Sequence, residues 1–201
     1  MSINLIETIA QYDNICNYFH LPVQSGSNRI LKLMNRNYQI ENYIFLVKNI
    51  KNKIKNCAIS TDIITGYPSE TLADHNATIS LLKEIRFSNA FMFRYSPREG
   101  TRAFKQIDDV PEDKKIRRLN EIITLQNSIS KEENLKEINS IVEILVDNQS
   151  KKKPTNWFGK TKTSKVVVFE NSSNCIKLGD VIKVRITKAT SATLTGELVK
   201  E

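Results

Sequence analysis

The sequence contains few of the residues that mark special architectures. Its 201 residues include only 6 Gly and 5 Pro, which excludes a collagen-like or low-complexity chain. It has no run of about 18 apolar residues, so no segment is expected to span a membrane. The N-terminal residues lack the basic stretch and apolar core of a secretory signal. We therefore expect a cytoplasmic protein.

Cysteine and clustered glycine are equally scarce. Cys16, Cys57 and Cys175 lie far apart, which excludes a disulfide scaffold and a closely spaced metal-binding pair and predicts a reduced chain with no metal site. Gly26 and Gly66 are isolated, so no glycine-rich phosphate-binding loop is present. The sequence has neither a histidine pair nor a Ser/His/Asp arrangement that would indicate a hydrolase.

The rest of the composition is typical of a globular protein, with 40% hydrophobic and 26% charged residues. The positive charge is concentrated at one end of the chain. Residues 151–201 contain 11 Lys and Arg against 4 Asp and Glu, a net charge of +7, whereas residues 1–150 carry +1. This asymmetry indicates either a C-terminal domain that faces nucleic acid or a solvated, lysine-rich surface.

The first three quarters of the chain alternate predicted strands and helices. Apolar, β-branched runs predict three strands, over 15–23, 57–65 and 90–95. Apolar residues three or four positions apart predict four helices, over 28–34, 40–54, 69–85 and 112–136. Asn28 is the expected cap of the first helix, and Leu72 and Ile79 are expected to face inward in the third. This order predicts right-handed crossovers and a parallel sheet, hence an α/β fold.

Polar residues follow each predicted strand. They are the segments 24–27, 66–70 and 95–98. Because ligands of parallel α/β sheets bind outside the carboxyl ends of the strands, this placement predicts a site there. Asp62 within its strand requires a partner, for which Arg94 on the neighbouring strand is the candidate. Glu70 either satisfies backbone N–H groups at a helix start or holds a ligand. Asp62 and Glu70 each belong either to a structural ion pair or to a pair of site residues.

The two histidines are not expected to be ligands. His20 at the end of an apolar strand is expected to be a packed, hydrogen-bonded residue, and His75 is expected to be exposed on a helix.

Beyond residue 136 the pattern changes to short strands separated by turns. Alternating or β-branched runs predict strands over 138–146, 166–169, 181–186 and 192–198. Several short strands at this spacing predict a small antiparallel barrel. We therefore expect two domains, residues 1–136 and residues 137–201.

Basic and aromatic side chains lie together near the start of the predicted barrel. They are Lys151, Lys152, Lys153, Trp157, Phe158, Lys160, Lys162 and Lys165. Basic side chains neutralise phosphates, and an aromatic ring beside them stacks on an unpaired base, so this loop is a candidate RNA-binding site. The alternative is that Trp157 and Phe158 close the end of the barrel and the lysines are solvated.

Four strings in the chain resemble the methylthiotransferases, a family of radical S-adenosylmethionine enzymes. The strings are HLPVQSGS (20–27), LMNR (33–36), TDIITGYPSET (61–71) and FRYSPREGT (93–101). The resemblance continues through Arg118 and Leu119 to Asn134, and the C-terminal part is similar to a TRAM domain, the small RNA-binding barrel of that family. The string 95–101 resembles the tRNA-modifying, MiaB-type branch. In the alternative branch, which modifies a ribosomal-protein aspartate, the position of Arg98 tends to be acidic.

The resemblance implies a fold, a reaction and a set of cofactor-binding residues. The fold is part of a radical-SAM (β/α) barrel followed by an OB-like TRAM barrel. The reaction adds a methylthio group at C2 of N6-isopentenyladenosine beside the tRNA anticodon and consumes S-adenosylmethionine as radical source and methyl donor. The residues implied to contact S-adenosylmethionine are Gln24, Ser25, Gly26, Asp62, Gly66, Glu70, Arg94 and Arg98.

The chain departs from the family in one respect. Family members carry a CxxxCxxC motif for a [4Fe-4S] cluster and three further cysteines for a second cluster, and these 201 residues contain neither set. The resemblance therefore implies an enzyme portion without its own catalytic residues, inactive alone and completed by a separate N-terminal half, as the product of a split or truncated gene. The alternatives are a stand-alone tRNA-binding module and a non-functional remnant. The first strand of the partial barrel is expected to expose an unpaired edge.

Overall fold

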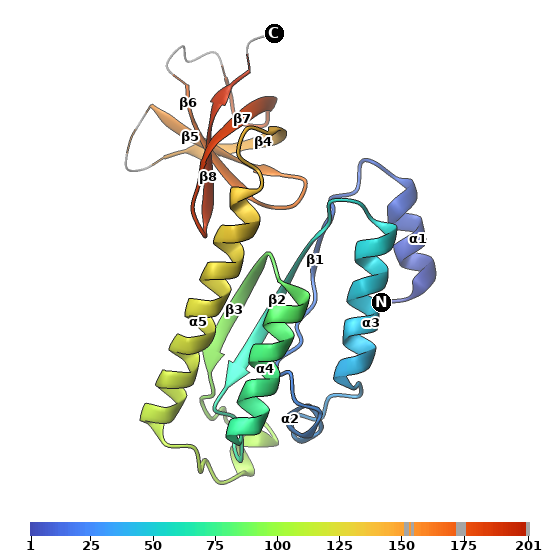
Figure 1. Ribbon diagram of the computed structural model, residues 1–201, viewed down its shortest axis with the longest axis vertical. Coiled ribbons are helices and arrows are strands. Elements are labelled where there is room, and N and C mark those ends of the chain that lie inside the picture. Colours follow the sequence, from blue (N-terminus) through green and yellow to red (C-terminus); the bar gives the residue numbers. More distant parts are fainter. Residues whose placement is uncertain (151–152, 154, 172–175, 200–201) are drawn as a thin grey trace.

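A computed structural model of the chain describes residues 1–150, 153, 155–171 and 176–199. An α/β part and a small β-barrel lie at opposite ends of the molecule, and one long helix joins them (Figure 1). The α/β part contains α1 (Ile3–Gln11), β1 (Tyr18–His20), α2 (Asn28–Leu33), α3 (Ile40–Lys53), β2 (Ala58–Thr65), α4 (Leu72–Ile85), β3 (Asn89–Arg94), the short 3-10 helix η1 (Ala103–Lys105) and α5 (Glu112–Leu135).

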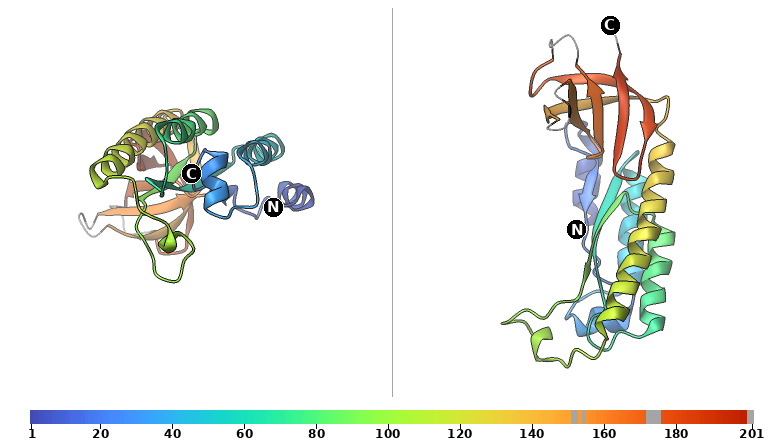
Figure 2. Two further views of the ribbon diagram at one scale, coloured as in Figure 1. Left: turned by 90° about the horizontal axis from the view of Figure 1, so that it is seen from below. Right: turned by 90° about the vertical axis from the view of Figure 1, so that its left-hand side faces the viewer.

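The three strands form a parallel sheet in the order β1-β2-β3, as the alternation of strands and helices predicted. One face of the sheet is covered. Ile59 and Ile63 of β2 are buried in a core that includes Val47 of α3, Leu82 of α4 and Ile122 of α5. Figure 2 shows α4 and α5 along one side of the sheet, while the loop after β3 extends from the other side.

In the described part of the chain, the other face of the sheet is covered only at the strand ends, where Ile64 packs in a cluster with Ile30 of α2 and Ala103 of η1. Because side chains alternate along a strand, Ser60, Asp62 and Ile64 point away from the core side. On β3, Phe91 and Phe93 are 47% and 53% exposed. The α/β part is therefore a half-covered sheet.

The local predictions need four corrections. Helix α1 was not predicted, although Ser2 caps it and Ile6 is buried in the core. Strand β1 covers only three residues of the predicted 15–23, since Pro22 has no N–H to donate. Ser27, not Asn28, caps α2 by accepting a hydrogen bond from the N–H of Ile30. The buried face of α4 is rotated, so that Leu72 is 61% exposed.

The second part is a closed barrel in the strand order β4-β5-β6-β8-β7. Its strands are β4 (Ile141–Gln149), β5 (Asn156–Thr161), β6 (Val166–Glu170), β7 (Val181–Ala189) and β8 (Thr193–Leu198). The barrel has its own core, which includes Ile144, Val167, Phe169, Val184 and Ile186. Two details differ from the prediction: β6 and β8 pair in parallel, and Trp157 and Phe158 lie in a strand instead of a loop.

Helix α5 connects the two parts and ends where the barrel begins. The Asn134 side-chain amide donates to the carbonyl of Thr190 at 2.9 Å, and Lys165 pairs with Glu137 at 2.8 Å. These contacts attach the barrel to the end of α5. No helix in the described part of the chain is both long and apolar enough to cross a membrane.

Candidate functional site

The polar segments predicted to form a site lie together at one edge of the sheet. Parallel pairing aligns His20 with Ser60 and Thr65 with Arg94, so the turns after β1, β2 and β3 leave the sheet at the same end. Gln24 adds a further bridge to Ile63. This convergence is the geometry that a ligand site at strand ends requires.

The turn after β1 packs against α4. Ser25 is fully buried, and its hydroxyl accepts a hydrogen bond from the N–H of Ser27 at 3.2 Å. The N–H of Gly26 donates to the Thr78 hydroxyl at 2.9 Å. A Cβ at Gly26 would lie 2.5 Å from the carbonyl oxygen of Ala77, so glycine is required here by the helix. These two predicted cofactor residues therefore hold the turn in place.

Asp74 connects this turn to the next one, and the sequence analysis did not identify it. Its carboxylate accepts the hydroxyl hydrogen of Ser27 at 2.5 Å, the backbone N–H of Thr71 at 2.8 Å and an ion pair from Arg29. Burial alone would raise the pKa of Asp74, but these hydrogen bonds from Arg29, Ser27 and Thr71 outweigh it and lower the pKa well below its usual value. The Thr71–Asp74 capping box in the sequence was the available signal.

The turn after β2 is held by a buried ion pair. The Glu70 carboxylate accepts the N–H of Gly66 at 2.7 Å and Nη1 of Arg118 at 2.7 Å. Burial raises the pKa of Glu70, and the Gly66 N–H and Arg118 oppose that rise. Gly66 has φ +68°, and a Cβ there would lie 2.3 Å from Cγ of Lys115. Of the two roles that the sequence left open for Glu70, the observed contacts are those of a turn-stabilising carboxylate.

His75 differs from its predicted position. Its side chain is 1% exposed, and Nε2 lies 2.9 Å from a carboxylate oxygen of Glu121 on α5. The prediction of an exposed histidine was wrong because α4 presents Asp74, His75 and Thr78, rather than Leu72, to the neighbouring helix and turns. His75 therefore ties α4 to α5.

The uncovered face of the sheet carries a row of polar side chains. Nδ1 of His20 lies 2.9 Å from the Ser60 hydroxyl, which also contacts the Tyr18 hydroxyl at 2.7 Å. Nε2 of His20 lies 3.4 Å from Asp62. The prediction that Arg94 pairs with Asp62 was therefore wrong: Arg94 pairs with Glu112 at the start of α5.

A Ser–His–Asp row is thus present, and the sequence analysis did not predict it. Ser60 is fully buried, so its hydroxyl is not accessible as a nucleophile. The His20 ring packs edge-on against Phe91, with ring centroids 5.8 Å apart. His20 is hydrogen-bonded, as expected, and its side chain is 40% exposed toward the uncovered face. The row links Tyr18, Ser60, His20 and Asp62 by short polar contacts on this face.

The last predicted cofactor residue, Arg98, lies in the exposed loop after β3. Its carbonyl accepts hydrogen bonds from the N–H and hydroxyl of Thr101 at 3.3 and 2.7 Å. Tyr95, which precedes the loop, is buried, and the ammonium of Lys115 lies 5.3 Å from its ring centroid. Arg98 therefore keeps its side chain in solvent while the loop base is fixed.

An iron–sulfur cluster does not fit the described residues. Cys16 is exposed and Cys57 is partly buried, and both are free thiols. Cys175 lies outside the described residues. Within the described ranges, no three His, Cys, Asp or Glu side chains gather where they could hold a metal ion. Burial raises the pKa of the Cys57 thiol, which disfavours the thiolate that a cluster needs.

Four of the predicted RNA-binding lysines, those that the structure describes, have partners within the chain. Lys160 lies 3.7 Å from Asp147 and Lys153 lies 3.9 Å from Glu170. Lys162 donates to the carbonyl of Asp13 at 3.2 Å. Lys162 and Lys165 line a cavity of about 650 Å³ between the barrel and the ends of α3 and α4. These two lysines therefore face the α/β part, while Lys153 and Lys160 face solvent.

Trp157 and Phe158 are consecutive residues of β5, and both are partly buried. Trp157 packs against the barrel core, and its indole N–H has no hydrogen-bond partner in the described part of the chain. Lys151 and Lys152 lie outside the described residues. Trp157 therefore contributes to the packing of the barrel.

Two family models match the chain. The radical SAM superfamily model matches residues 2–82, and the TRAM domain model matches residues 135–199. Among curated relatives, proteins named tRNA-2-methylthio-N(6)-dimethylallyladenosine synthase from Phocaeicola vulgatus and Bacteroides thetaiotaomicron are each 50% identical over 200 residues. The same name is carried by a Christiangramia forsetii protein that is 48% identical over 198 residues.

The alignments cover nearly all of this chain but less than half of each relative. They include 99% of the chain for the first two relatives and 98% for the third. The chain spans 43%, 44% and 41% of their respective lengths. Its sequence therefore corresponds to one portion of these longer proteins, made of radical SAM and TRAM segments.

Proposed function

We propose that this chain, a radical SAM segment followed by a TRAM domain, is the C-terminal portion of a tRNA methylthiotransferase. The reaction of the whole enzyme adds a methylthio group to N6-dimethylallyladenosine in tRNA. The observation that carries this proposal is the alignment of nearly the whole chain with relatives named for that product. The names also favour the tRNA-modifying branch over the branch that modifies a ribosomal-protein aspartate.

The proposed division of labour follows the two domains, residues 1–136 and 137–201. The strand ends of the sheet form one wall of the site for the modified nucleoside, and the barrel holds tRNA. Lys153 and Lys160, whose ammonium groups are exposed and lie 3.9 and 3.7 Å from single carboxylates, can exchange those partners for phosphates. Phosphate contact by Lys162 and Lys165 requires breaking contacts with the α/β part.

S-adenosylmethionine, when bound, supplies the methyl group and the radical. Eight residues were predicted to contact it. Among them, Ser25 and Glu70 accept hydrogen bonds within the fold. Gly26 and Gly66 lie where a Cβ would clash with Ala77 and Lys115. Gln24 is buried, and Arg94 pairs with Glu112. The side chain of Arg98 is exposed, and that of Asp62, 3.4 Å from Nε2 of His20, is 28% exposed. We assign direct cofactor contact to Asp62 and Arg98 and a positioning role to Ser25, Glu70 and the two glycines.

The iron–sulfur cluster ligands must come from sequence outside these 201 residues, in the same or a second polypeptide. This follows from the misfit between the cysteines and a cluster. The 201-residue chain alone is therefore expected to bind tRNA and to be inactive.

Anaerobic reconstitution of the isolated chain with iron and sulfide tests the proposal. We expect no absorbance of a four-iron cluster and no cleavage of added S-adenosylmethionine, together with salt-dependent binding of tRNA. A cluster that forms and cleaves S-adenosylmethionine would contradict the assigned inactivity. A tRNA affinity that does not change with salt would contradict phosphate binding by the barrel.

A second candidate function is a tRNA-binding module that acts without the reaction. The closed barrel with its own buried core favours it, since this part needs no further strands to complete its fold. The two candidates differ in whether tRNA becomes modified when the remaining enzyme portion is supplied.

A further inference from the structure

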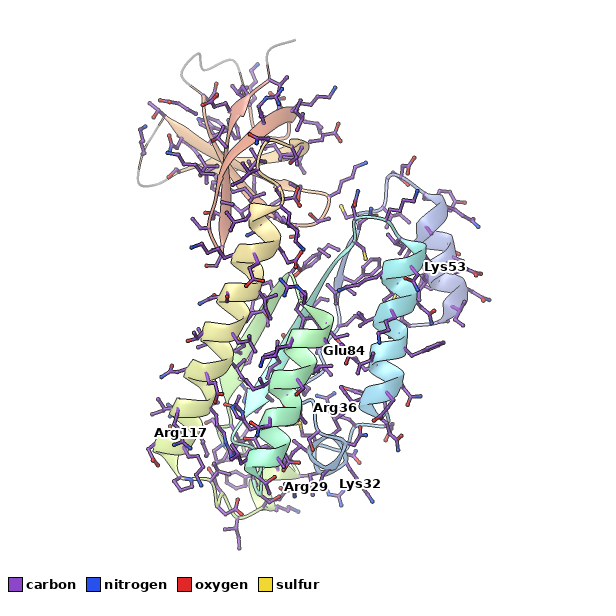
Figure 3. The ribbon with its side chains drawn as sticks, viewed as in Figure 1. Arg29, Lys32, Arg36, Lys53, Glu84 and Arg117 are labelled. Atoms are coloured by element: carbon purple, nitrogen blue, oxygen red, sulfur yellow. The ribbon has the colours of Figure 1, made fainter. Side chains whose placement is uncertain are left out.

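A basic hollow lies beside α2 at the end of the molecule opposite the barrel. It has a volume of about 540 Å³ and is lined by polar side chains from α2 and the segment that leads into α3: Asn28, Arg29, Lys32, Arg36, Asn37, Tyr38, Gln39 and Asn42. None of these lining residues is acidic. Figure 3 shows Arg29, Lys32 and Arg36 near α2, far from the barrel. We refer to this feature as the α2 hollow.

The cations of the α2 hollow differ in their availability. Arg29 is already used, because it pairs with Asp74 and donates to the carbonyl of Ser69 at 2.6 Å. Lys32 and Arg36 are exposed, and neither has an ion-pair partner among the described residues. The nearest carboxylate on α3, Glu41, accepts hydrogen bonds from Asn28. Two cations are therefore free to take an external anion.

The lining chemistry suits phosphate oxygens. Arg36 offers a planar set of donors, Lys32 offers an ammonium, and Asn37, Gln39 and Asn42 offer side-chain amides. Such donors bind phosphodiester groups without reading base sequence. The barrel lysines Lys153 and Lys160, by contrast, must first leave a carboxylate.

The position of the α2 hollow explains why a second basic surface is useful. Helix α5 has 24 residues and is therefore about 36 Å long, with the strand ends beside its first turn and the barrel after its last (Figure 1). An RNA held only by the barrel is not fixed at the strand ends. A folded RNA longer than α5 is long enough to contact both surfaces.

We propose that the α2 hollow binds backbone phosphates of the same RNA that contacts the barrel, through Lys32 and Arg36. The inference rests on the proposed function, since it takes tRNA as the ligand. It adds a second contact region that fixes the RNA at the strand ends.

The test measures tRNA affinity of the full chain at several salt concentrations, with the double variant Lys32→Ala/Arg36→Ala. We expect weaker binding and a slope of log K against log salt that is shallower by about 2, because each lost phosphate contact removes about one unit. The charge-reversed variant Lys32→Glu/Arg36→Glu should weaken binding further. The matched control is Lys83→Ala/Lys131→Ala, which removes two exposed helix cations that have no ion-pair partner in the described chain and should leave the slope unchanged.

Each outcome decides between the inference and its alternatives. An unchanged slope in the Lys32/Arg36 variant, with a shallower slope in Lys160→Ala, would overturn the inference and leave the proposed function standing. Absence of tRNA binding by the unaltered chain would overturn both. Tight binding of inorganic phosphate that depends on Lys32 and Arg36, without an effect on tRNA, would identify a small-anion site instead. Circular dichroism verifies that each variant is folded.

Discussion

The barrel and the sheet of this chain use their strands in opposite ways. Every barrel strand has a neighbour on both sides, because β4 pairs with β5 and β7, and β6 joins β5 to β8. In the sheet, β1 and β3 each have one strand neighbour in the described part of the chain. The barrel thus satisfies its own backbone, whereas the sheet leaves two edges and one face available.

The side chains follow the same difference. Phe169 in the barrel is 1% exposed, whereas Phe93 on the uncovered face of the sheet is 53% exposed. What holds the strand ends of the sheet is a set of buried polar contacts around Asp74, Glu70 and Arg118 rather than apolar packing alone. The barrel therefore closes its own backbone pairing around its own core, whereas the three-stranded sheet leaves edges and apolar rings exposed.

The largest difference in the free energy of unfolding is expected when Phe is replaced by Ala in the barrel core and, separately, on the uncovered face of the sheet. Phe169→Ala should lower the free energy of unfolding by about 3–5 kcal/mol, because it leaves a cavity in the barrel core. Phe93→Ala should change it by less than about 0.5 kcal/mol, because Phe93 is already 53% exposed. Urea unfolding of both variants measures the difference. A similar loss in the two variants would show that the uncovered face is packed in solution.

The buried ion pair of the sheet should give the next largest effect. Glu70→Gln should lower the free energy of unfolding by about 3 kcal/mol, because Arg118 is left buried and without a charge partner. The control is Glu132→Gln, whose carboxylate pairs with Arg86 at the surface, where solvent screens the pair, so that its loss should be much smaller. Equal losses in the two variants, measured by urea unfolding, would contradict the structural role assigned to Glu70.

The lowered pKa of Asp74 predicts a smaller effect, a free energy of unfolding that depends on pH. Asp74→Asn should cost about 2 kcal/mol at pH 7, since charged hydrogen bonds from Arg29, Ser27 and Thr71 are weakened. Because the folded-state pKa of Asp74 is lowered, its contribution is complete above the unfolded pKa and is lost as the pH falls below about 4. Unfolding measured from pH 7 to pH 2 should show the two proteins converging. A difference that stays constant with pH would contradict this account.

The smallest effect on stability is expected at the barrel surface. Lys160→Ala removes a solvent-exposed pair with Asp147 and should change the free energy of unfolding by less than about 0.5 kcal/mol. The same variant should weaken tRNA binding and make its salt dependence shallower by about one unit. Titration with tRNA at several salt concentrations measures this, and an unaltered affinity would remove Lys160 from the RNA surface.

The fold was largely predictable because its signals are local. β-Branched runs around Ile59 and Ile63 gave the central strand, and alternating residues such as Ile144 and Val146 gave the barrel. Helix α1 escaped because only its capping Ser2 and a few apolar residues mark it. The convergence of the three polar turns at one edge of the sheet also followed from the predicted parallel order.

The site contacts were less predictable because they join residues far apart in the sequence. The sheet register places Arg94 opposite Thr65 and Phe91 opposite Asp62, and Arg94 pairs instead with Glu112 on α5. His75 has the polarity of a surface residue, and only the packing of α4 on α5 buries it. Lys165 belongs to a run of basic residues, but Glu137 at the end of α5 neutralises it. Side-chain pairing of this kind depends on the tertiary fold.

The most direct test of the central claim replaces the matching portion of the Bacteroides thetaiotaomicron relative with this chain. The hybrid is produced in a strain without its own synthase, and its tRNA nucleosides are measured by mass spectrometry. We predict that 2-methylthio-N6-dimethylallyladenosine appears, as it does with the unaltered relative. A folded hybrid that binds tRNA but leaves only N6-dimethylallyladenosine would contradict the assignment of this chain as a working portion of that enzyme.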